Sequence, residues 1–382
     1  MGNFLQLVGY EYKKVLYRKS AVILILLALV VTAFSSTALL IPGFTVPPEG
    51  ESAWEAMIND REYDRALAGR QLDAELFLEA SAAHAAGNPR PYNSVLFLMQ
   101  HVFRSHYVTS EEAGNFYEAR RQLVEQAIYF NRERNMITDR GADAVRRLSD
   151  SVATPFVFDY TRGFTAFFNG SIHIIVSAFI IAIGVAPIFA GEYKTGMSQL
   201  ILTSKNGKGT LVLAKIFTAV TFSALISFLL IMTSFVLSML IFGSDGASAQ
   251  IQLIAPAAIL PVTLGQSAII LIAVSVARAL YFGTALLLLS SKLKSSFGVL
   301  IAAVIWLFLA SMLFIPIPNI WLINFHRLFI AVLPFGVSLF QAFHYEILGA
   351  AIMPAILEPL FAVAACAILA PLAGRAFRRH QE

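Results

Sequence analysis

Long apolar runs separated by short charged loops dominate the chain. Six of these runs are long enough to cross about 30 Å of hydrocarbon, which takes about 20 apolar residues in a helix. They cover residues 21–41, 171–190, 212–242, 264–290, 297–315 and 348–372. The pattern predicts an all-α membrane protein with six transmembrane helices.

Two segments leave room for other interpretations. Residues 253–260 are also apolar, but they contain Pro256 and precede Pro261, so we interpret them as an interfacial lead-in to span four rather than as part of that span. The first run exceeds the apolar core of about 7–15 residues that is typical of a cleaved signal peptide, which favours a retained span.

The lysines fix the expected orientation. All of them fall in three segments that flank apolar runs, namely 13–19, 194–215 and 292–294. Together with nearby arginines and the C-terminal tail, these segments carry thirteen basic residues, whereas the two short loops on the other side carry only Arg327. Short loops rich in Lys and Arg stay cytoplasmic during insertion. We therefore expect both termini inside, with a cytoplasmic tail at 374–382.

Composition agrees with a membrane protein and argues against nucleic-acid binding. The chain is 57% hydrophobic and 14% charged, where soluble domains have roughly a quarter charged residues. Its net charge of +4 is small and not gathered in a basic, aromatic-rich surface. The single cysteine, Cys366, excludes an intrachain disulfide.

Residues 43–170 form a region of different character between span one (20–42) and the remaining spans (171–373). It holds 13 arginines, no lysine and 18 acidic residues. Apolar residues recur at three-to-four spacing between Ala113 and Ile128, and Ser110 before Glu111 and Glu112 is typical of a helix start. A second helix is expected over about 53–83. We predict a compact helical extracytoplasmic domain, acting either as a lid or as a holder of substrate or partner.

The first 19 residues predict an amphipathic helix along the headgroup boundary. Glu11, Lys14 and Arg18 share its polar face. The apolar face comprises Phe4, Leu5, Val8, Tyr12, Val15 and Leu16. The alternative is a basic flank that only sets topology.

The loop 191–211 predicts a short helix at the inner face, followed by a glycine-rich turn. Its apolar positions are Met197, Leu200 and Ile201, and a soluble partner that docks there would move spans two and three together. The run Gly207-Lys208-Gly209 lacks the G-x-x-x-x-G-K-[ST] pattern of a phosphate-binding loop.

This loop resembles the E-x-x-x-G-T-x-x-x-L-L-x-x-P-x-x-R signature, followed by a lysine, of ABC-2 type permeases, the membrane subunits of ABC exporters. Glu192 and Gly196 match, and Ile201 and Leu202 stand at the leucine pair. Lys208 and Lys215 stand at the two basic positions, whereas Met197 replaces Thr or Ser and Lys205 replaces the proline. The resemblance covers most of the chain outside 43–170.

The resemblance implies a half-transporter in the cytoplasmic membrane of a bacterium. A second permease copy or paralogue would complete the pathway, and a separate nucleotide-binding subunit would bind ATP and Mg²⁺, since this chain is expected to bind no cofactor. Residues 1–19 would be the elbow helix, and 316–346 would re-enter the membrane from outside. The coupling helix that contacts the ATPase would use Glu192, Gly196, Met197, Leu200, Ile201 and Leu202.

Two charges lie within the apolar runs. Arg278 is about 21 Å from Lys292 along a helix, and Glu358 is about 25 Å from Arg375, so both fall at a similar depth toward the outer side. A charge at that depth is costly unless it is paired or hydrated. Either the two pair or line the pathway, or each extends separately to the outer headgroups.

Motifs for catalysis are missing from the sequence. H-E-x-x-H and G-x-S-x-G do not occur, and His173 and Ser177, one helical turn apart, lack an acid in their span. His101 and His106 have a loose zinc-ligand spacing without a cysteine pair, so we expect no metal site and no enzyme. Besides the exporter permease, a stand-alone secondary carrier and a non-transporting sensor or scaffold stay open.

Overall fold

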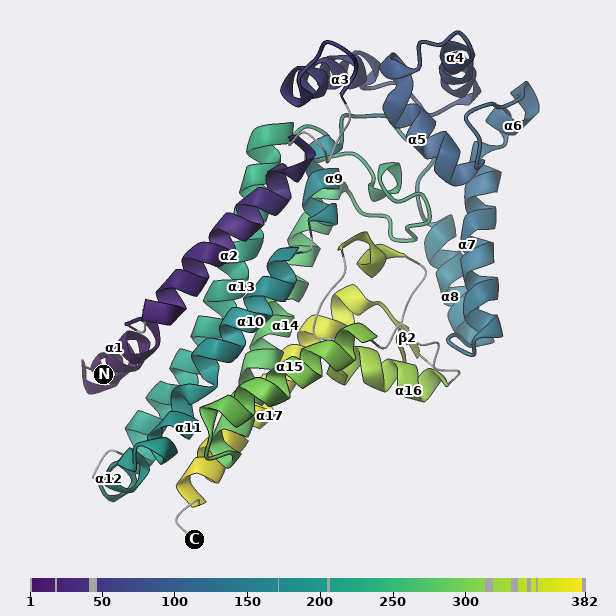
Figure 1. Ribbon diagram of the computed structural model, residues 1–382. Helices are drawn as coiled ribbons and strands as arrows, with labels where there is room; N and C mark the ends of the chain where they lie inside the picture. Colours follow the sequence, from purple (N-terminus) through teal and green to yellow (C-terminus); the bar gives the residue numbers. More distant parts are fainter. Residues whose placement is uncertain are drawn as a thin grey trace.

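The protein is described by a computed structural model that covers residues 2–17, 19–40, 47–170, 172–204, 207–312, 319–330, 336–341, 345–347 and 350–379. Figure 1 shows a long helical bundle that carries a smaller helical domain at one end. At the opposite end lie α1 (Gly2–Leu16), α12 (Met197–Thr203) and the C-terminal end of α17 (Pro354–Arg379) (Figure 1). We call this the basic end, because α1 ends there with Lys13 and Lys14.

Within the described residues, four helical runs of the bundle are long and apolar enough to cross a membrane. They are Arg162–Lys194, Gly207–Phe242, Leu264–Lys292 and Pro354–Arg379. A fifth is possible if α1 and α2 (Lys19–Thr37), which are bent by 71°, count as one span. The predicted class is therefore confirmed, and the chain is a helical membrane protein.

Several of these runs are built from shorter pieces. The first comprises α9 (Arg162–Asn169), α10 (Ile172–Val185) and α11 (Pro187–Lys194). The second joins a π-helical turn, η3 (Gly207–Leu211), to α13 (Val212–Phe242), which has the same bounds as the predicted third span. The third is α14 (Leu264–Lys292).

The segments around the expected fifth span are shorter. Helix α15 (Ser296–Met312) has 17 residues, about 25 Å of rise, and the apolar helix that follows combines α16 (Ile320–Phe325) with the π-helical turn η5 (His326–Ile330). The re-entrant segment expected over 316–346 lies partly outside the described residues. Its described remainder adds the 3₁₀ turn η6 (Gly336–Phe340) and β1 (Tyr345–Ile347), which pairs antiparallel with β2 (Ala350–Ile352).

Close helix packing in the bundle depends on small residues. A Cβ at Gly283 of α14 would lie 2.0 Å from the Ser223 Oγ of α13, and one at Gly184 of α10 would lie 2.2 Å from the ring of Phe222. Side chains of ordinary size would push these helices apart, so the two glycines permit the close approach that membrane helices use in place of hydrophobic driving force.

The domain at the other end is helical, as the sequence predicts. The expected helix over 53–83 is, however, interrupted near Gly69, which has φ +87° and ends one helix before the side chain of Asp73 caps the next. Thr109, one residue before the expected start, caps the following helix through a capping box with Glu112. The elements are α3 (Ala53–Leu67), α4 (Ala74–Ala85), η2 (Arg90–Tyr92), α5 (Asn93–Val102), α6 (Ser110–Gly114), α7 (Phe116–Glu133) and α8 (Asp139–Asp150).

This α3–α8 domain shares its hydrophobic core with the bundle. Phe77 and Phe116 belong to the same buried cluster as Leu264 and Leu271 of α14. The loop after α13, which includes the turn η4 (Ile251–Leu253), is also buried in this core and precedes the start of α14 at Leu264. Arg120 of α7, 3% exposed, donates to the carbonyls of Pro256 and Ala258 at 3.0 and 2.7 Å.

Candidate functional site

The corner between α11 and α12 is shaped by glycines. Gly196 joins the two helices with φ +70°, a left-handed conformation that costs an L side chain about 1–2 kcal/mol. Gly207, just after α12, lies so close to the Ile201 carbonyl that a Cβ would stand 1.5 Å from its oxygen. The tight fold of this corner therefore requires glycine at both positions.

Helix α12 presents part of its apolar surface outward. Met197 is 45% exposed and Leu200 is 64% exposed, whereas Ile201 is buried against the bundle. The side chain of Leu202 and residues 205–206 lie outside the described part of the chain. The corner thus offers two adjacent apolar side chains at the basic end of the molecule.

Behind this corner, four charged side chains from three helices meet. Lys215 of α13 is fully buried, and its Nζ donates to Glu11 Oε2 of α1 at 2.8 Å and to Glu192 Oε1 of α11 at 2.6 Å. Lys14 Nζ bridges the same two carboxylates from the solvent side, at 3.1 Å to Glu11 Oε1 and 2.9 Å to Glu192 Oε1. We call these four residues the inner cluster.

The inner cluster is electrically balanced, since two carboxylates face two ammonium groups. Lys215 also donates to the Ile188 carbonyl at 3.3 Å, so its three N–H groups each have an acceptor. A buried charge that loses its partner destabilises a protein by about 3–5 kcal/mol. The cluster therefore ties α1, α11 and α13 together for as long as its members stay in place.

Glu11 was placed on the solvent-facing side of the first helix by its sequence pattern, and this was wrong. Glu11 is 4% exposed and lies on the buried stripe between Val8 and Val15, whereas Leu5 of the expected apolar face is 65% exposed. The reason is tertiary, because α1 packs along α13 and brings Glu11 to Lys215. The one available signal was the i, i+3, i+7 spacing of Val8, Glu11 and Val15.

Other residues of the expected apolar face contact α13 near the inner cluster. Phe4 packs edge-on against Phe217 with ring centroids 5.8 Å apart, and the Tyr12 hydroxyl lies 2.6 Å from Thr221 Oγ1. Beside the inner cluster is an open cavity of about 300 Å³. It is lined by Glu11, Lys14, Val15, Pro187, Ile188, Gly191, Glu192, Thr195 and Met197.

The two intramembrane charges meet in the structure. Arg278 of α14 donates from Nε to Glu358 Oε2 of α17 at 3.1 Å, and both residues are buried. The hydroxyl of Tyr345 on β1 donates to the other carboxylate oxygen, Glu358 Oε1, at 2.9 Å and accepts from Arg278 at 3.3 Å. Tyr345 had not been expected in this cluster, because nothing in the sequence marks it among the tyrosines.

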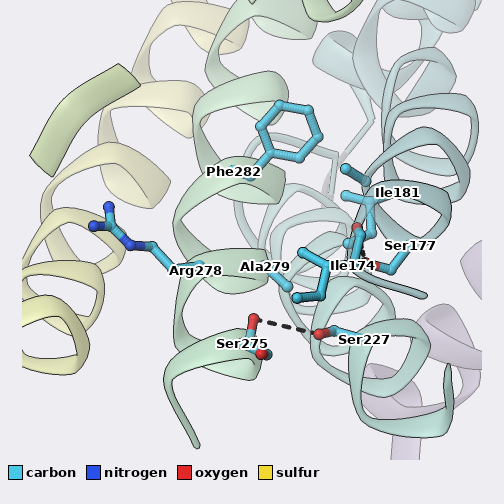
Figure 2. Close-up of a pocket in the computed structure, with 9 residues that line it drawn as sticks. Ile174, Ser177, Ile181, Ser227, Ser275, Arg278, Ala279 and Phe282 are labelled. Atoms are coloured by element: carbon cyan, nitrogen blue, oxygen red, sulfur yellow. Dashed lines mark hydrogen bonds between the residues drawn. The ribbon is translucent and has the colours of Figure 1, made fainter. Parts of the chain in front are cut away.

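A small polar void lies between α10, α13 and α14 (Figure 2). Its volume is about 10 Å³, and Ser227 Oγ donates across it to the Ser275 carbonyl at 3.3 Å. Ser177, once considered with His173 as a catalytic pair, donates to the Ile174 carbonyl at 2.7 Å. Within the described residues, no group of three or more His, Cys, Asp or Glu side chains is arranged to hold a metal ion.

Comparison of the chain with protein-family models, with curated proteins and with solved structures gives no match.

Proposed function

We propose that the chain is the transmembrane permease subunit of an ATP-driven ABC exporter in the cytoplasmic membrane of a bacterium. In this proposal six helices cross the membrane, α1 is the elbow helix and both termini are cytoplasmic. A separate subunit binds ATP and Mg²⁺ and hydrolyses the ATP, and a second permease copy or paralogue completes the pathway. The substrate is hydrophobic or amphipathic, such as a peptide, a lipid or an antibiotic.

The inner cluster is the observation that carries this proposal. Glu192 lies in α11, one turn before the corner that leads to α12, and Lys215 is the fourth residue of α13. Their 2.6 Å contact therefore links the helix that carries the corner to a helix long enough to span the bilayer. Glu11 extends the same link to α1 at 2.8 Å. A force applied to α12 is therefore transmitted to two neighbouring helices instead of bending a loose loop.

The exposed pair on α12 supplies the contact for an ATPase. Met197 and Leu200 are a small apolar surface next to the basic end, where charge asymmetry predicts the cytoplasm. Apolar side chains that project from a water-facing corner are typical of a protein interface. ATP-driven closure of two such ATPase subunits would push α12, tilt α11 and α13, and open the far end of the bundle.

Docking is tested by co-purification. The chain is co-expressed with an ABC nucleotide-binding subunit from the same genome, and the double variant Met197→Glu/Leu200→Glu is compared with wild type. We expect at least a tenfold loss of captured ATPase, because two charges would be buried in an apolar contact. Leu293→Glu, which also alters an exposed apolar side chain between two helices, is the matched control and should retain binding.

Orientation is tested independently. Gln199→Cys in a Cys366→Ser background is exposed to a membrane-impermeant thiol reagent in right-side-out and inverted vesicles. Labelling only in inverted vesicles supports the proposal, and labelling from the outside refutes it.

A sensor role is the second candidate, and the shared core favours it. Because the α3–α8 domain packs into one core with α14, a ligand that changes the conformation of that domain would also change the packing of a membrane helix. Ligand-stimulated ATP hydrolysis without substrate accumulation in vesicles would support the sensor over the exporter.

A further inference from the structure

Side chains donate to four consecutive carbonyl groups in the last described turn of the helix formed by α16 and η5, at residues 327–330. The final carbonyls of a helix have no partners within it and must find them elsewhere, most of all at membrane depth. Here Arg278 donates to the carbonyls of Arg327 and Leu328 at 2.9 and 2.7 Å. The Tyr281 hydroxyl donates to the Phe329 carbonyl at 2.9 Å, and Trp306 Nε1 donates to the Ile330 carbonyl at 3.0 Å.

Arg278 is the strongest of these caps. Its cation lies at the negative end of the helix dipole, and its planar fork reaches two consecutive carbonyls at once. Its orientation is fixed on the other side by Glu358 and by the Tyr345 hydroxyl. The position of the α16–η5 helix therefore depends on Tyr345 as well as on the ion pair.

The residue after Tyr345 holds a different part of the molecule. Consecutive side chains of a strand point to opposite faces, and Glu346 reaches away from the ion pair to the α3–α8 domain. Its Oε1 accepts the backbone N–H of Thr138 at 2.8 Å, and Thr138 is the N-cap of α8. A carboxylate at this place also complements the positive end of the α8 dipole.

Strand β1 also contacts the α16–η5 helix directly, since Asn324 Nδ2 donates to the Glu346 carbonyl at 3.0 Å. Figure 1 shows β2, the partner of β1, between α16 and α8. Three parts of the molecule thus meet at two adjacent residues: the Arg278–Glu358 pair, the α16–η5 helix and α8.

We propose that β1 is a strap that couples the α3–α8 domain to the α16–η5 helix, with Glu346 and Tyr345 as its two positioning residues. Displacement of α8 moves Glu346, and the rigid strand moves Tyr345 relative to Arg278 and Glu358. The caps on the helix end then shift together.

Hydrogen exchange of the full chain in lipid nanodiscs tests the strap. Exchange is followed by mass spectrometry in two peptides, one covering 319–330 and one covering 138–150. Glu346→Ala removes the acceptor of the Thr138 N–H on the α8 side of the strap, and we expect it to raise exchange about fivefold in 319–330 as well, the opening expected from one lost hydrogen bond. Tyr345→Phe removes one hydroxyl, and reciprocity of coupling requires it to raise exchange in 138–150 too.

Two further variants keep the test decisive. Glu125→Ala breaks an ion pair with Arg146 on the α8 surface without touching β1, so it should change exchange in 138–150 alone. Glu346→Gln keeps an acceptor oxygen and should stay within about twofold of wild type. The strap is refuted if Glu346→Ala and Tyr345→Phe each alter only the peptide that they directly touch, or if the Glu125→Ala control raises exchange in 319–330 equally.

Discussion

Two buried clusters of charge in the described part of the molecule are built from different cations. One, the inner cluster, lies at the basic end, and the other surrounds Arg278 at the middle of α14. The inner cluster uses lysines, and Lys215 sits fully buried between Glu11 and Glu192 while Lys14 covers them from solvent. The cluster around Arg278 uses an arginine whose donors reach a carboxylate, a hydroxyl and two backbone carbonyls.

The two kinds of cation suit two different structural roles. An ammonium group is a compact charge that can exchange partners, and the inner cluster opens on a cavity of about 300 Å³, which leaves room for rearrangement. A guanidinium group imposes planar geometry, and Arg278 holds a helix end whose carbonyls are fixed in position. The lysine cluster suits a joint that moves, and the arginine cluster suits an anchor.

Removal of the anchor should have the largest effect. Arg278→Met removes the guanidinium that donates to Glu358 and to the carbonyls of Arg327 and Leu328, and we expect a loss of about 3–5 kcal/mol in stability. Arg278→Lys should recover only part of this, because one ammonium cannot reproduce the fork. Thermal unfolding in detergent measures both. Equal stability of Arg278→Lys and wild type would contradict the role of geometry.

The charge swap Arg278→Glu/Glu358→Arg sharpens the same contrast. If only the ion pair mattered, the double variant would be as stable as wild type. We expect a recovery of less than half of the loss seen in Arg278→Glu, since a glutamate at 278 cannot donate to the carbonyls of Arg327 and Leu328.

At the joint, Lys215→Met should cost about 3 kcal/mol, because Glu11 and Glu192 would then share only the half-exposed Lys14. Lys14→Met should cost less than about 1 kcal/mol, as is usual for ion pairs open to solvent. The two losses of stability, measured as shifts of the unfolding midpoint in the same detergent, test whether burial of the lysine determines how much it stabilises the protein. Similar losses for Lys215→Met and Lys14→Met would contradict this.

Outside the bundle, the buried carboxyl of Asp64 accepts a hydrogen bond from the Ser94 hydroxyl and forms no ion pair with a described residue. Burial raises the pKa of Asp64 from 3.8 to about 6, against the opposing effects of the Ser94 hydroxyl and the charge of Arg162, while Asp60 raises it further. The folded state thus holds a proton that the unfolded state has lost. The stability contributed by this proton is present in full below pH 4, is lost as the pH rises through about 6, and does not change further above that; the total loss is about 3 kcal/mol. Asp64→Asn should remove this slope, which urea unfolding between pH 4 and 7 would measure.

A smaller effect on stability than that of Lys215→Met is expected at the corner of the joint. Gly196→Ala forces a side chain into a left-handed backbone at a cost of about 1–2 kcal/mol, whereas Gly196→Asn is better tolerated there. If the chain is an exporter permease, as we propose, and the corner transmits force, the alanine variant in complex with an ATPase subunit should lose transport while retaining hydrolysis, and asparagine should restore part of the transport. Full transport by Gly196→Ala would remove the corner from the mechanism.

The sequence predicted those parts of the fold that depend on local pattern. The bounds of α13 coincide with its apolar run, and the capping box at Thr109 starts α6 within one residue of the predicted helix start. The break at Gly69 was missed because a single glycine in a helical pattern is often tolerated, and only the surrounding packing decides whether its positive φ is used.

The candidate site divides in the same way. Glu192, Gly196 and Met197 were identified from a short signature, and the structure brings Glu192 to Lys215 across 23 residues. Glu11 was assigned to the wrong face, since its partner is 204 residues away and an amphipathic pattern carries no information about a distant lysine.

By itself, the sequence determined that this is a helical membrane protein, because the length of an apolar run is a local property and decides whether a helix can cross the bilayer. Tertiary structure alone decided which polar groups share the interior. Arg278 and Glu358 are 80 residues apart, and their contact with Tyr345 and the helix end at Arg327 exists only because α14, α17 and β1 pack together. In a medium that cannot solvate charge, packing determines the partners that every buried charge must have.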